Sequence, residues 1–264
     1  MNQLNLDKII NFYTDSDESI RLTKHPVNPE FDITMDYIHK YAKPGCKILE
    51  IGAGPGTYSL QLAKEGYDVT AVELVPKNLA VLRSRITENM TIKTYLGNAI
   101  DLSFLEDNTF DIVLSLGPMY HIFEKENQLK AISEASRVCK PGSYIFFAYC
   151  GLVAAIIRLC FVKHRILEAI QNKDLNSDWS FVPNETSRFN IVEKKQIDAL
   201  MENFNNLQRL HFVGVDPAFE MLNKCEDMSE YEAEKYLDFA KCIAEKEDCI
   251  GLNNHYLDIQ QKGV

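Results

Sequence analysis

Three glycines lie close together in the segment Gly52-Ala53-Gly54-Pro55-Gly56, directly after a short apolar run. Glycine lets a chain turn sharply and lets its backbone approach a ligand closely. The segment also precedes a stretch with helical periodicity, and the free N–H groups at a helix start face such a ligand. We therefore expect a ligand-binding loop between a strand and a helix.

An acidic residue, Glu73, follows Gly52 at a distance typical of nucleoside-binding folds, at the end of the next expected strand. A carboxylate in that position accepts hydrogen bonds from the hydroxyls of an adenosine ribose. Alone, these features fit NAD, FAD or S-adenosylmethionine. The dinucleotide pattern G-x-G-x-x-G would need glycine where the chain has Thr57. No Gly-Lys-Ser/Thr follows either, so the loop does not suit a P-loop nucleotide site.

The elements around this loop alternate regularly, which predicts a parallel sheet covered by helices on both faces. The expected strands are Lys47–Glu50, Asp68–Glu73, Ile92–Leu96, Phe110–Leu116 and Ser143–Cys150. The expected helices between them are Thr57–Glu65, Pro76–Glu88 and Lys125–Cys139.

We interpret residues 1–264 as a single domain in four parts. Residues 1–45 form an N-terminal helical segment with a helix at Ile33–Tyr41, and residues 46–150 form the cofactor-binding core. Residues 151–190 are a lid insertion that begins with a helix at Gly151–Gln171, expected over the carboxyl edge of the sheet. Residues 191–264 complete the sheet around a helical insertion. Their expected elements are Val192–Phe204 (helix), Leu207–Val213 (strand), Pro217–Asp248 (acidic, helical) and His255–Gln261 (strand).

Composition narrows the class of protein. The net charge of −10 argues against DNA or RNA as the main partner, because nucleic-acid affinity rests largely on phosphate neutralisation. Seven cysteines without a C-x-x-C pair indicate reduced thiols. The start of the chain lacks a signal peptide, and the apolar run Tyr144–Val162 reads as a strand followed by a helix. We expect a soluble, cytoplasmic protein without a membrane anchor; its oligomeric state stays open.

The ordered motifs resemble the class I S-adenosylmethionine-dependent methyltransferases, whose first motif is close to E-x-G-x-G-x-G. In this chain that motif starts at Glu50. Four later segments match in the same order, and the resemblance runs through about residues 47–150. They are Val69–Glu73, Gly97–Asp101, Phe110–Leu116 and Arg137–Ser143.

The resemblance implies an α/β, Rossmann-like fold with a mostly parallel seven-stranded sheet, its final strand antiparallel, and S-adenosylmethionine as the cofactor. Glu73 would hold the ribose, and Asn98, where the family usually has Asp, would lie beside the adenine. Glu50 either contacts the ligand or organises the loop as a buried carboxylate. The full set of expected cofactor-binding residues is Glu50, Gly52, Ala53, Gly54, Gly56, Glu73, Leu74, Asn98, Ala99 and Leu116.

Candidate catalytic residues follow the fourth strand, which in this family ends near the methyl group. Gly117-Pro118 predicts a rigid turn that aims Tyr120 and His121 at the substrate. Methyl transfer needs a base only when the nucleophile arrives protonated. His121 would be that base and Tyr120 would orient the nucleophile, or both would pack structurally. No histidine has metal-ligand spacing with carboxylates or thiols, so we expect no metal site.

The function expected from this resemblance is methyl transfer to a small-molecule acceptor. A protein methyltransferase is one alternative, and a catalytically inactive cofactor-binding regulatory protein is another. The turn after the fourth strand is also similar to that of a group of bacterial methyltransferases with an N-terminal Arg-Leu pair, here Arg21-Leu22. That similarity names no substrate.

Overall fold

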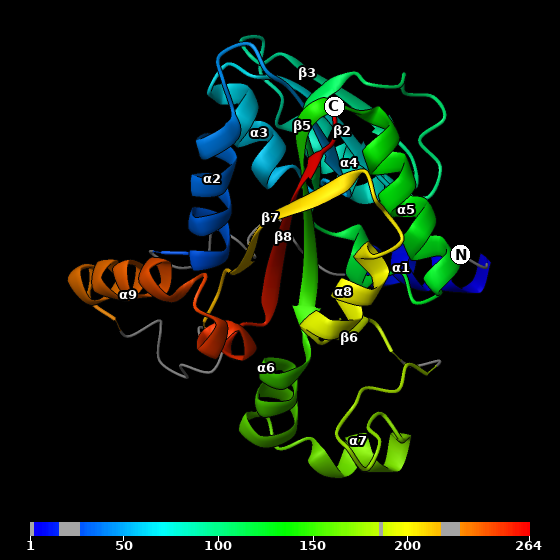
Figure 1. The fold of residues 1–264 in the computed structure, drawn as a ribbon, viewed down its shortest axis with the longest axis vertical. Coiled ribbons are helices and arrows are strands. Elements are labelled where there is room, and N and C mark those ends of the chain that lie inside the picture. Colours follow the sequence, from blue (N-terminus) through cyan, green and yellow to red (C-terminus); the bar gives the residue numbers. More distant parts are fainter. Residues whose placement is uncertain (1–2, 16–26, 185–186, 218–227) are drawn as a thin grey trace.

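The computed structural model describes residues 3–15, 27–184, 187–217 and 228–264, and these residues form an eight-stranded sheet flanked by helices (Figure 1). The strand order is β3-β2-β1-β4-β5-β8-β7, with the short β6 paired to the end of β5. β8 runs antiparallel to both of its neighbours, whereas the other pairs are parallel. The strands are β1 Lys47–Ile51, β2 Asp68–Glu73, β3 Ile92–Leu96, β4 Phe110–Ser115, β5 Cys139–Gly151, β6 Ile191–Val192, β7 Leu207–Gly214 and β8 His255–Lys262.

The sheet agrees with the predicted α/β, mostly parallel architecture, including the antiparallel last strand, but the predicted number of seven strands is wrong. The additional strand is β6, in which Ile191 and Val192 pair with the end of β5. Two residues are too few to produce an alternating pattern. The sequence had instead assigned Val192 to the start of a helix, which in the structure begins at Lys194.

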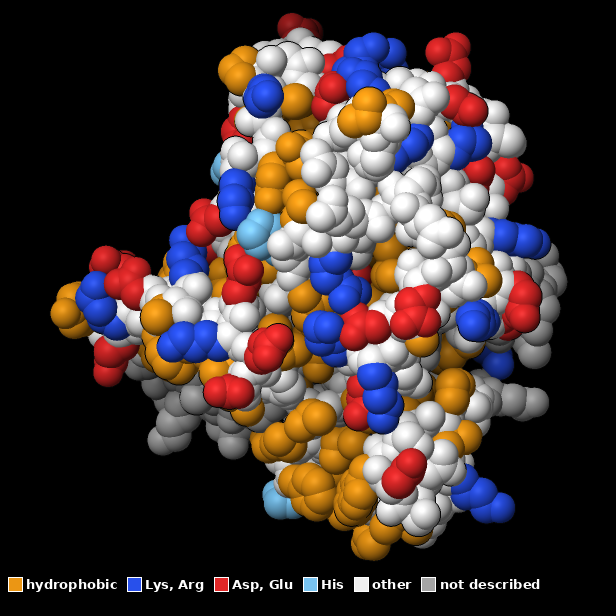
Figure 2. All heavy atoms as spheres, viewed as in Figure 1, with side chains coloured by type: hydrophobic (Ala, Val, Ile, Leu, Met, Phe, Trp, Pro, Cys, Tyr) orange, Lys and Arg blue, Asp and Glu red, His pale blue; other side chains and the backbone are white. Residues whose placement is uncertain are grey.

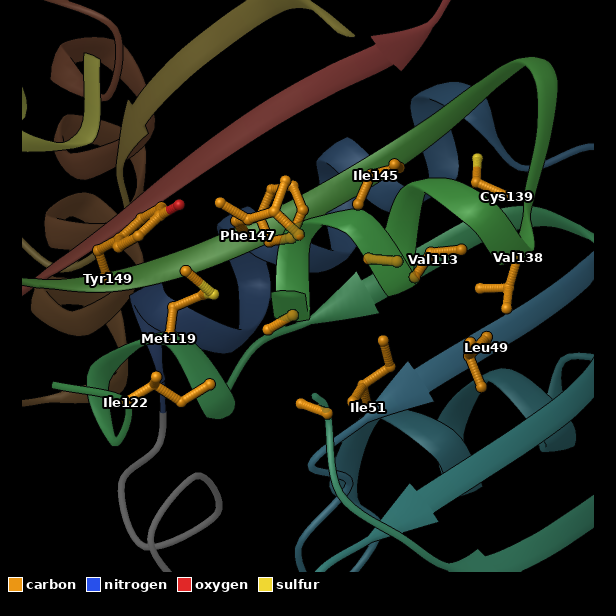
Figure 3. Packing of buried hydrophobic residues seen from close by; sticks show 14 of the residues in the cluster. Leu49, Ile51, Val113, Met119, Ile122, Val138, Cys139, Ile145, Phe147 and Tyr149 are labelled. Atoms are coloured by element: carbon orange, nitrogen blue, oxygen red, sulfur yellow. The ribbon is translucent and has the colours of Figure 1, made fainter. Parts of the chain in front are cut away.

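One face of the sheet packs against α5 (Lys125–Val138) and α8 (Lys194–Met201). Leu49, Val113 and Phe147 point toward α5 from β1, β4 and β5 (Figure 3). All three side chains are fully buried. Their neighbours along each strand point to the opposite face, because successive side chains of a strand alternate.

The opposite face packs against α2 (Pro29–Tyr41), α3 (Thr57–Lys64) and α9 (Glu230–Ile243). Ile48, Ile112 and Phe146 are fully buried there. Both faces of the central strands are therefore covered, which explains why they read as continuous apolar runs in the sequence. α4 (Pro76–Ser84) lies against β2 and β3, and α1 (Gln3–Asp15) packs on α4.

The predicted long helix at Gly151–Gln171 is wrong as a single element. It is divided into α6 (Leu152–Ile156), the π-helix η3 (Ile157–Val162) and α7 (Ile166–Asn172). His164 has a φ of 55°, which an α-helix cannot contain, so the chain turns before α7. Hydrophobic side chains gather on the surface of this part (Figure 2), among them Val153, Phe161, Leu167, Ile170 and Trp179.

The segments that flank the core differ less from the predictions. The acidic segment expected at Pro217–Asp248 contains α9 and the 3₁₀ helix η6 (Glu247–Leu252), and residues 218–227 lie outside the described residues. The Arg21-Leu22 pair also lies outside them. In the described parts of the chain, no helix is both long and apolar enough to span a membrane. The apolar run Tyr144–Val162 is β5 followed by α6 and η3, as its sequence indicated.

Candidate functional site

The glycine loop leaves β1 in a conformation that favours glycine at three positions, since Gly56 also has a positive φ, of +89°. Gly52 and Gly54 have φ values of +74° and +56°, where other residues are strained. A Cβ on Gly52 would lie 2.9 Å from Cδ of Pro118, so the loop lies against the turn after β4. A Cβ on Gly54 would meet no atom within 4 Å, so its backbone faces open space. Such a bare backbone is suited to close contact with a ligand.

Glu50 organises this loop from inside the protein. Its carboxylate accepts hydrogen bonds from the backbone N–H of Ser59, at 2.9 Å, and from the Ser59 hydroxyl. Burial raises the pKa of Glu50 to about 8, although the two Ser59 donors oppose the shift. These contacts fix the first turn of α3 against the end of β1. Glu50 also lines the cavity described below, so the structure combines both readings of this residue.

Glu73 ties the loop to the end of β2. One carboxylate oxygen accepts from the Gly54 N–H at 2.7 Å and the other from the Val75 N–H at 2.8 Å. Burial raises the pKa of Glu73, and these backbone donors oppose the rise. The Asn78 side chain and the Leu74 N–H also donate to Glu73, so this carboxylate is held in a fixed orientation at the wall of the cavity.

A cavity of about 130 Å³ lies where β1, β2 and β4 end, at the carboxyl edge of the sheet. Ligands bind at this edge in open α/β sheets. One water needs only about 10–15 Å³, so the cavity has room for a larger ligand. The predicted residues that line it are Glu50, Gly52, Ala53, Gly54, Glu73, Leu74, Asn98, Ala99, Leu116, Tyr120 and His121.

Two residues predicted to bind the cofactor, Gly56 and Asn98, have contacts within the protein that bear on that role. Gly56 is not among the lining residues; its absent side chain makes room for Leu82, whose Cγ would lie 2.7 Å from a Cβ. Asn98 lines the cavity, but its amide oxygen also accepts from the Ile100 N–H at 3.3 Å. That oxygen has a second lone pair for an adenine amino group.

The cavity is also lined by N-terminal residues that the sequence did not single out. Ile9 and Tyr13 reach it from α1, and Glu30 reaches it from the first turn of α2. No sequence motif indicated that these helices line a ligand cavity, because their periodicity predicts only an apolar face. Other lining residues beyond the motifs are Tyr58, Asn78 and Ile122.

The predicted lid, residues 151–190, reaches the site at the turn after β4, where Arg188 and Phe189 contact His121. No described residue of that stretch lines the cavity. Its last residues instead brace the turn after β4: the Asn190 N–H donates to the Tyr120 carbonyl at 2.7 Å. In the structure α1 covers the cavity, and the division of the chain at 151–190 stays a prediction.

The turn after β4 presents Tyr120 and His121 to the cavity because its other side chains are anchored. Met119 and Ile122 are buried beside Tyr149 of β5 (Figure 3). Tyr120 and His121, which lie between them, line the cavity. The turn contains the 3₁₀ helix η2 (Pro118–Tyr120).

His121 is held at both ring nitrogens. Nδ1 lies 3.1 Å from the Arg188 carbonyl, which can only accept, so Nδ1 carries the proton. Nε2 then accepts from the Tyr13 hydroxyl at 2.7 Å. Burial lowers the pKa of His121 to about 4, so the ring is neutral at neutral pH. These contacts suit a positioning group better than the general base that the sequence suggested.

The comparisons with known proteins agree with this geometry. Residues 49–147 match the family described as a methyltransferase domain. A ubiquinone biosynthesis O-methyltransferase of Xanthomonas campestris is 26% identical over 193 residues, which cover 70% of this chain and 78% of that protein.

Two solved structures share the fold. A structure titled as an S-adenosylmethionine-dependent methyltransferase of Methanosarcina mazei has a TM-score of 0.59 and 19% identity, covering 86% of this chain and 97% of that one. A Pyrococcus horikoshii protein has a TM-score of 0.60 and 18% identity, covering 97% of each chain. The matched domain spans β1 to β5, the part that carries the glycine loop and Glu73. Residues 49–147 therefore form a methyltransferase domain, and the chain has the Rossmann-like fold of an S-adenosylmethionine-dependent methyltransferase.

Proposed function

We propose that the protein transfers the methyl group of S-adenosylmethionine to a small-molecule acceptor. The observation that carries the proposal is the cover that α1 forms over the cavity, through Ile9 and Tyr13. A cavity partly covered by a helix admits a small molecule more readily than a side chain on a folded protein.

The residues around the cavity fit the cofactor. Glu73 lines the cavity at the end of β2, where a carboxylate would hold the two ribose hydroxyls, and the bare backbone at Gly54 suits the close approach of the amino-acid part. Leu74, Asn98 and Ala99 follow β2 and β3, where the adenine would lie. When bound, the cofactor supplies an activated methyl group, so the protein need only orient the acceptor and exclude water.

The acceptor end of the cavity would lie at the turn after β4. Leu116 and Tyr120 line the cavity there, on the side of the glycine loop away from Glu73. Tyr120 would orient the acceptor, with its ring 4.9 Å from that of His121. The curated relative named as an O-methyltransferase of ubiquinone biosynthesis acts on a small molecule by its name, which supports the same class of acceptor here.

The two alternatives predict different cavities. A protein methyltransferase would need an open groove, and an inactive cofactor-binding protein would need no space beside the methyl group. The cover that α1 forms over part of the cavity disfavours a protein methyltransferase. The extension of the cavity to Tyr120 and His121 disfavours an inactive cofactor-binding protein.

A cofactor-consumption screen over a metabolite library tests the proposal. S-adenosylhomocysteine should accumulate with at least one small molecule and not with denatured proteins or peptides. Accumulation with peptides alone would favour protein methylation, and no turnover despite tight cofactor binding would favour the inactive protein.

A further inference from the structure

Three ionisable side chains from distant parts of the chain meet beside the cavity. They are Glu30 of α2, Asp216 just after β7 and His255 at the start of β8. His255 Nδ1 lies 2.7 Å from Asp216 Oδ2 and 3.5 Å from Glu30 Oε2. The His255 N–H also donates to Asp216 Oδ1 at 2.9 Å. Asp216 therefore holds both the ring and the backbone of His255.

This cluster lies on the acceptor side of the cavity. β8 and β7 follow β5 in the sheet, whereas β2, which carries Glu73, lies on the other side of β1. The rings of His255 and Tyr120 are 6.4 Å apart, and Tyr120 lines the cavity. Of the three clustered residues, Glu30 is the one that lines the cavity itself. Glu30 therefore joins the cluster to the side of the cavity where the methyl group would be transferred.

The position of Glu30 is fixed from two directions. Its backbone belongs to the first turn of α2, where Pro29 is the first helical residue and Asn28 caps the helix by accepting from the Phe31 N–H. The Tyr58 hydroxyl donates to its carbonyl at 3.4 Å. Its side chain faces His255, whose charge the surrounding acids set. Burial opposes protonation of this ring, but Glu30 and Asp216 outweigh it and raise the pKa of His255 well above 6.5.

We propose that Glu30 is the carboxylate beside the transferring methyl group and that it accepts the acceptor's proton. His255 and Asp216 are positioning residues: Asp216 holds the imidazolium, and the imidazolium holds Glu30. The acceptor is then a molecule whose nucleophilic atom carries a proton, an amine or a hydroxyl. The inference rests on the proposed function and adds the chemical class of the acceptor.

The proton balance of the step is simple. As the lone pair of the acceptor nitrogen or oxygen forms the new bond to the methyl carbon, the electron pair of the broken carbon–sulfur bond stays on sulfur. The N–H or O–H proton passes to a carboxylate oxygen of Glu30 and from there to water. No oxidant or metal is needed.

Binding of two cofactor analogues tests the placement without knowledge of the acceptor. S-adenosylhomocysteine lacks the methyl group, whereas sinefungin carries an ammonium-bearing carbon in place of the methyl-bearing sulfur. Calorimetry on the full chain should show that sinefungin binds more tightly than S-adenosylhomocysteine. Glu30→Gln should lower this preference by about 10- to 100-fold, because the ammonium loses a charge-assisted hydrogen bond. Affinity for S-adenosylhomocysteine should stay unchanged.

Variants at an acidic residue and a histidine outside the cluster show whether the effect depends on the position of the charge that is removed. Glu126→Gln, an exposed acid on α5, should leave the preference intact. His255→Gln should reduce it in part, while His39→Gln, at a histidine with 44% of its side chain exposed, should not. If thermal melting shows that Glu30→Gln does not fold, Glu30→Asp replaces it: it keeps the charge opposite His255 but withdraws the carboxylate by one methylene, so it should also lower the preference for sinefungin, and an unchanged preference would contradict the placement.

Several results would overturn the proposal. A wild-type protein without preference for sinefungin, or a preference that survives Glu30→Gln, would place the carboxylate away from the methyl group. If Glu30→Gln lowered the affinity for both analogues equally, the Glu30 carboxylate would lie at the amino-acid end that the two analogues share. An acceptor without a proton to lose, such as a thioether, would exclude the proton-accepting role. If neither analogue binds to the wild type, the proposed function itself fails.

Discussion

Two buried carboxylates, Glu50 and Glu73, stand at the ends of neighbouring strands, but their partners differ. Both donors to Glu50 belong to Ser59 of α3, so Glu50 joins a strand to a helix. The donors to Glu73 are Gly54 of the glycine loop and Leu74, Val75 and Asn78, all at the wall of the cavity. At the scale of single residues, Glu73 is thus the carboxylate suited to hold a ligand.

Glu73→Ala should weaken binding of S-adenosylhomocysteine by about 1–3 kcal/mol, because the ribose hydroxyls would lose their acceptor. Calorimetry measures the loss, and Glu88→Ala, at an exposed acid after α4, is the matched control. Unchanged affinity in a folded Glu73→Ala protein would mean that the ribose lies elsewhere.

His121→Gln tests whether His121 is a base or a positioning residue. Glutamine can hydrogen-bond but cannot take up a proton at neutral pH. Turnover of an acceptor found in the screen should stay within about tenfold of the wild type if His121 only positions Tyr13 and the turn. A fall of about 10²–10⁴-fold, with cofactor binding intact, would restore His121 as the general base.

The neutral state of His121 also predicts a dependence of stability on pH. The pKa of His121 is about 4 in the folded protein and about 6.5 unfolded, so only the unfolded state gains a proton between these values. This stabilisation is complete above pH 6.5 and is lost as the pH falls toward 4, by about 3 kcal/mol. Denaturant unfolding at pH 7.5 and 5 should show a smaller loss in His121→Gln than in the wild type. An equal loss in both would contradict the buried neutral ring.

At the scale of elements, α1 lines the cavity that the sequence had predicted the 151–190 segment to cover, and that segment reaches the site through Arg188 and Phe189. The sequence predicted the glycine loop, the ribose carboxylate and the turn after β4 correctly as parts of the site. Their motifs could be recognised because the backbone geometry requires particular residues there, as at Gly52 and Gly54. A covering helix needs only an apolar face, so many segments of the sequence qualify equally. The break at His164 was hidden for the same reason, since the apolar residues continue on both sides of it.

Removal of residues 1–15 should speed dissociation of S-adenosylhomocysteine, because Ile9 and Tyr13 would no longer close the cavity. Stopped-flow fluorescence with a displacing ligand measures the rate. Trp179→Ala, within the predicted lid, should leave the rate unchanged. Faster release from Trp179→Ala and not from the truncated protein would return the lid to residues 151–190.

At the scale of the whole molecule, the site is assembled by the order of the sheet. Sequence spacing located β1 to β5 and their ligand-facing ends, since these elements alternate regularly along the chain. It found no metal-ligand spacing between His255 and carboxylates or thiols and assigned His255 no role in the site. The insertion of β8 between β5 and β7 brings the start of β8 beside the end of β7, and so His255 beside Asp216. Such a contact depends on tertiary pairing that local patterns do not encode.

Calorimetric titration of the full chain with S-adenosylhomocysteine and with NAD tests the central claim most directly. The loop geometry, the carboxylate of Glu73 and the covered cavity predict saturable binding of S-adenosylhomocysteine and no comparable binding of NAD. Preference for NAD, or no binding of S-adenosylhomocysteine by the folded protein, would contradict the assignment of this site to methyl transfer.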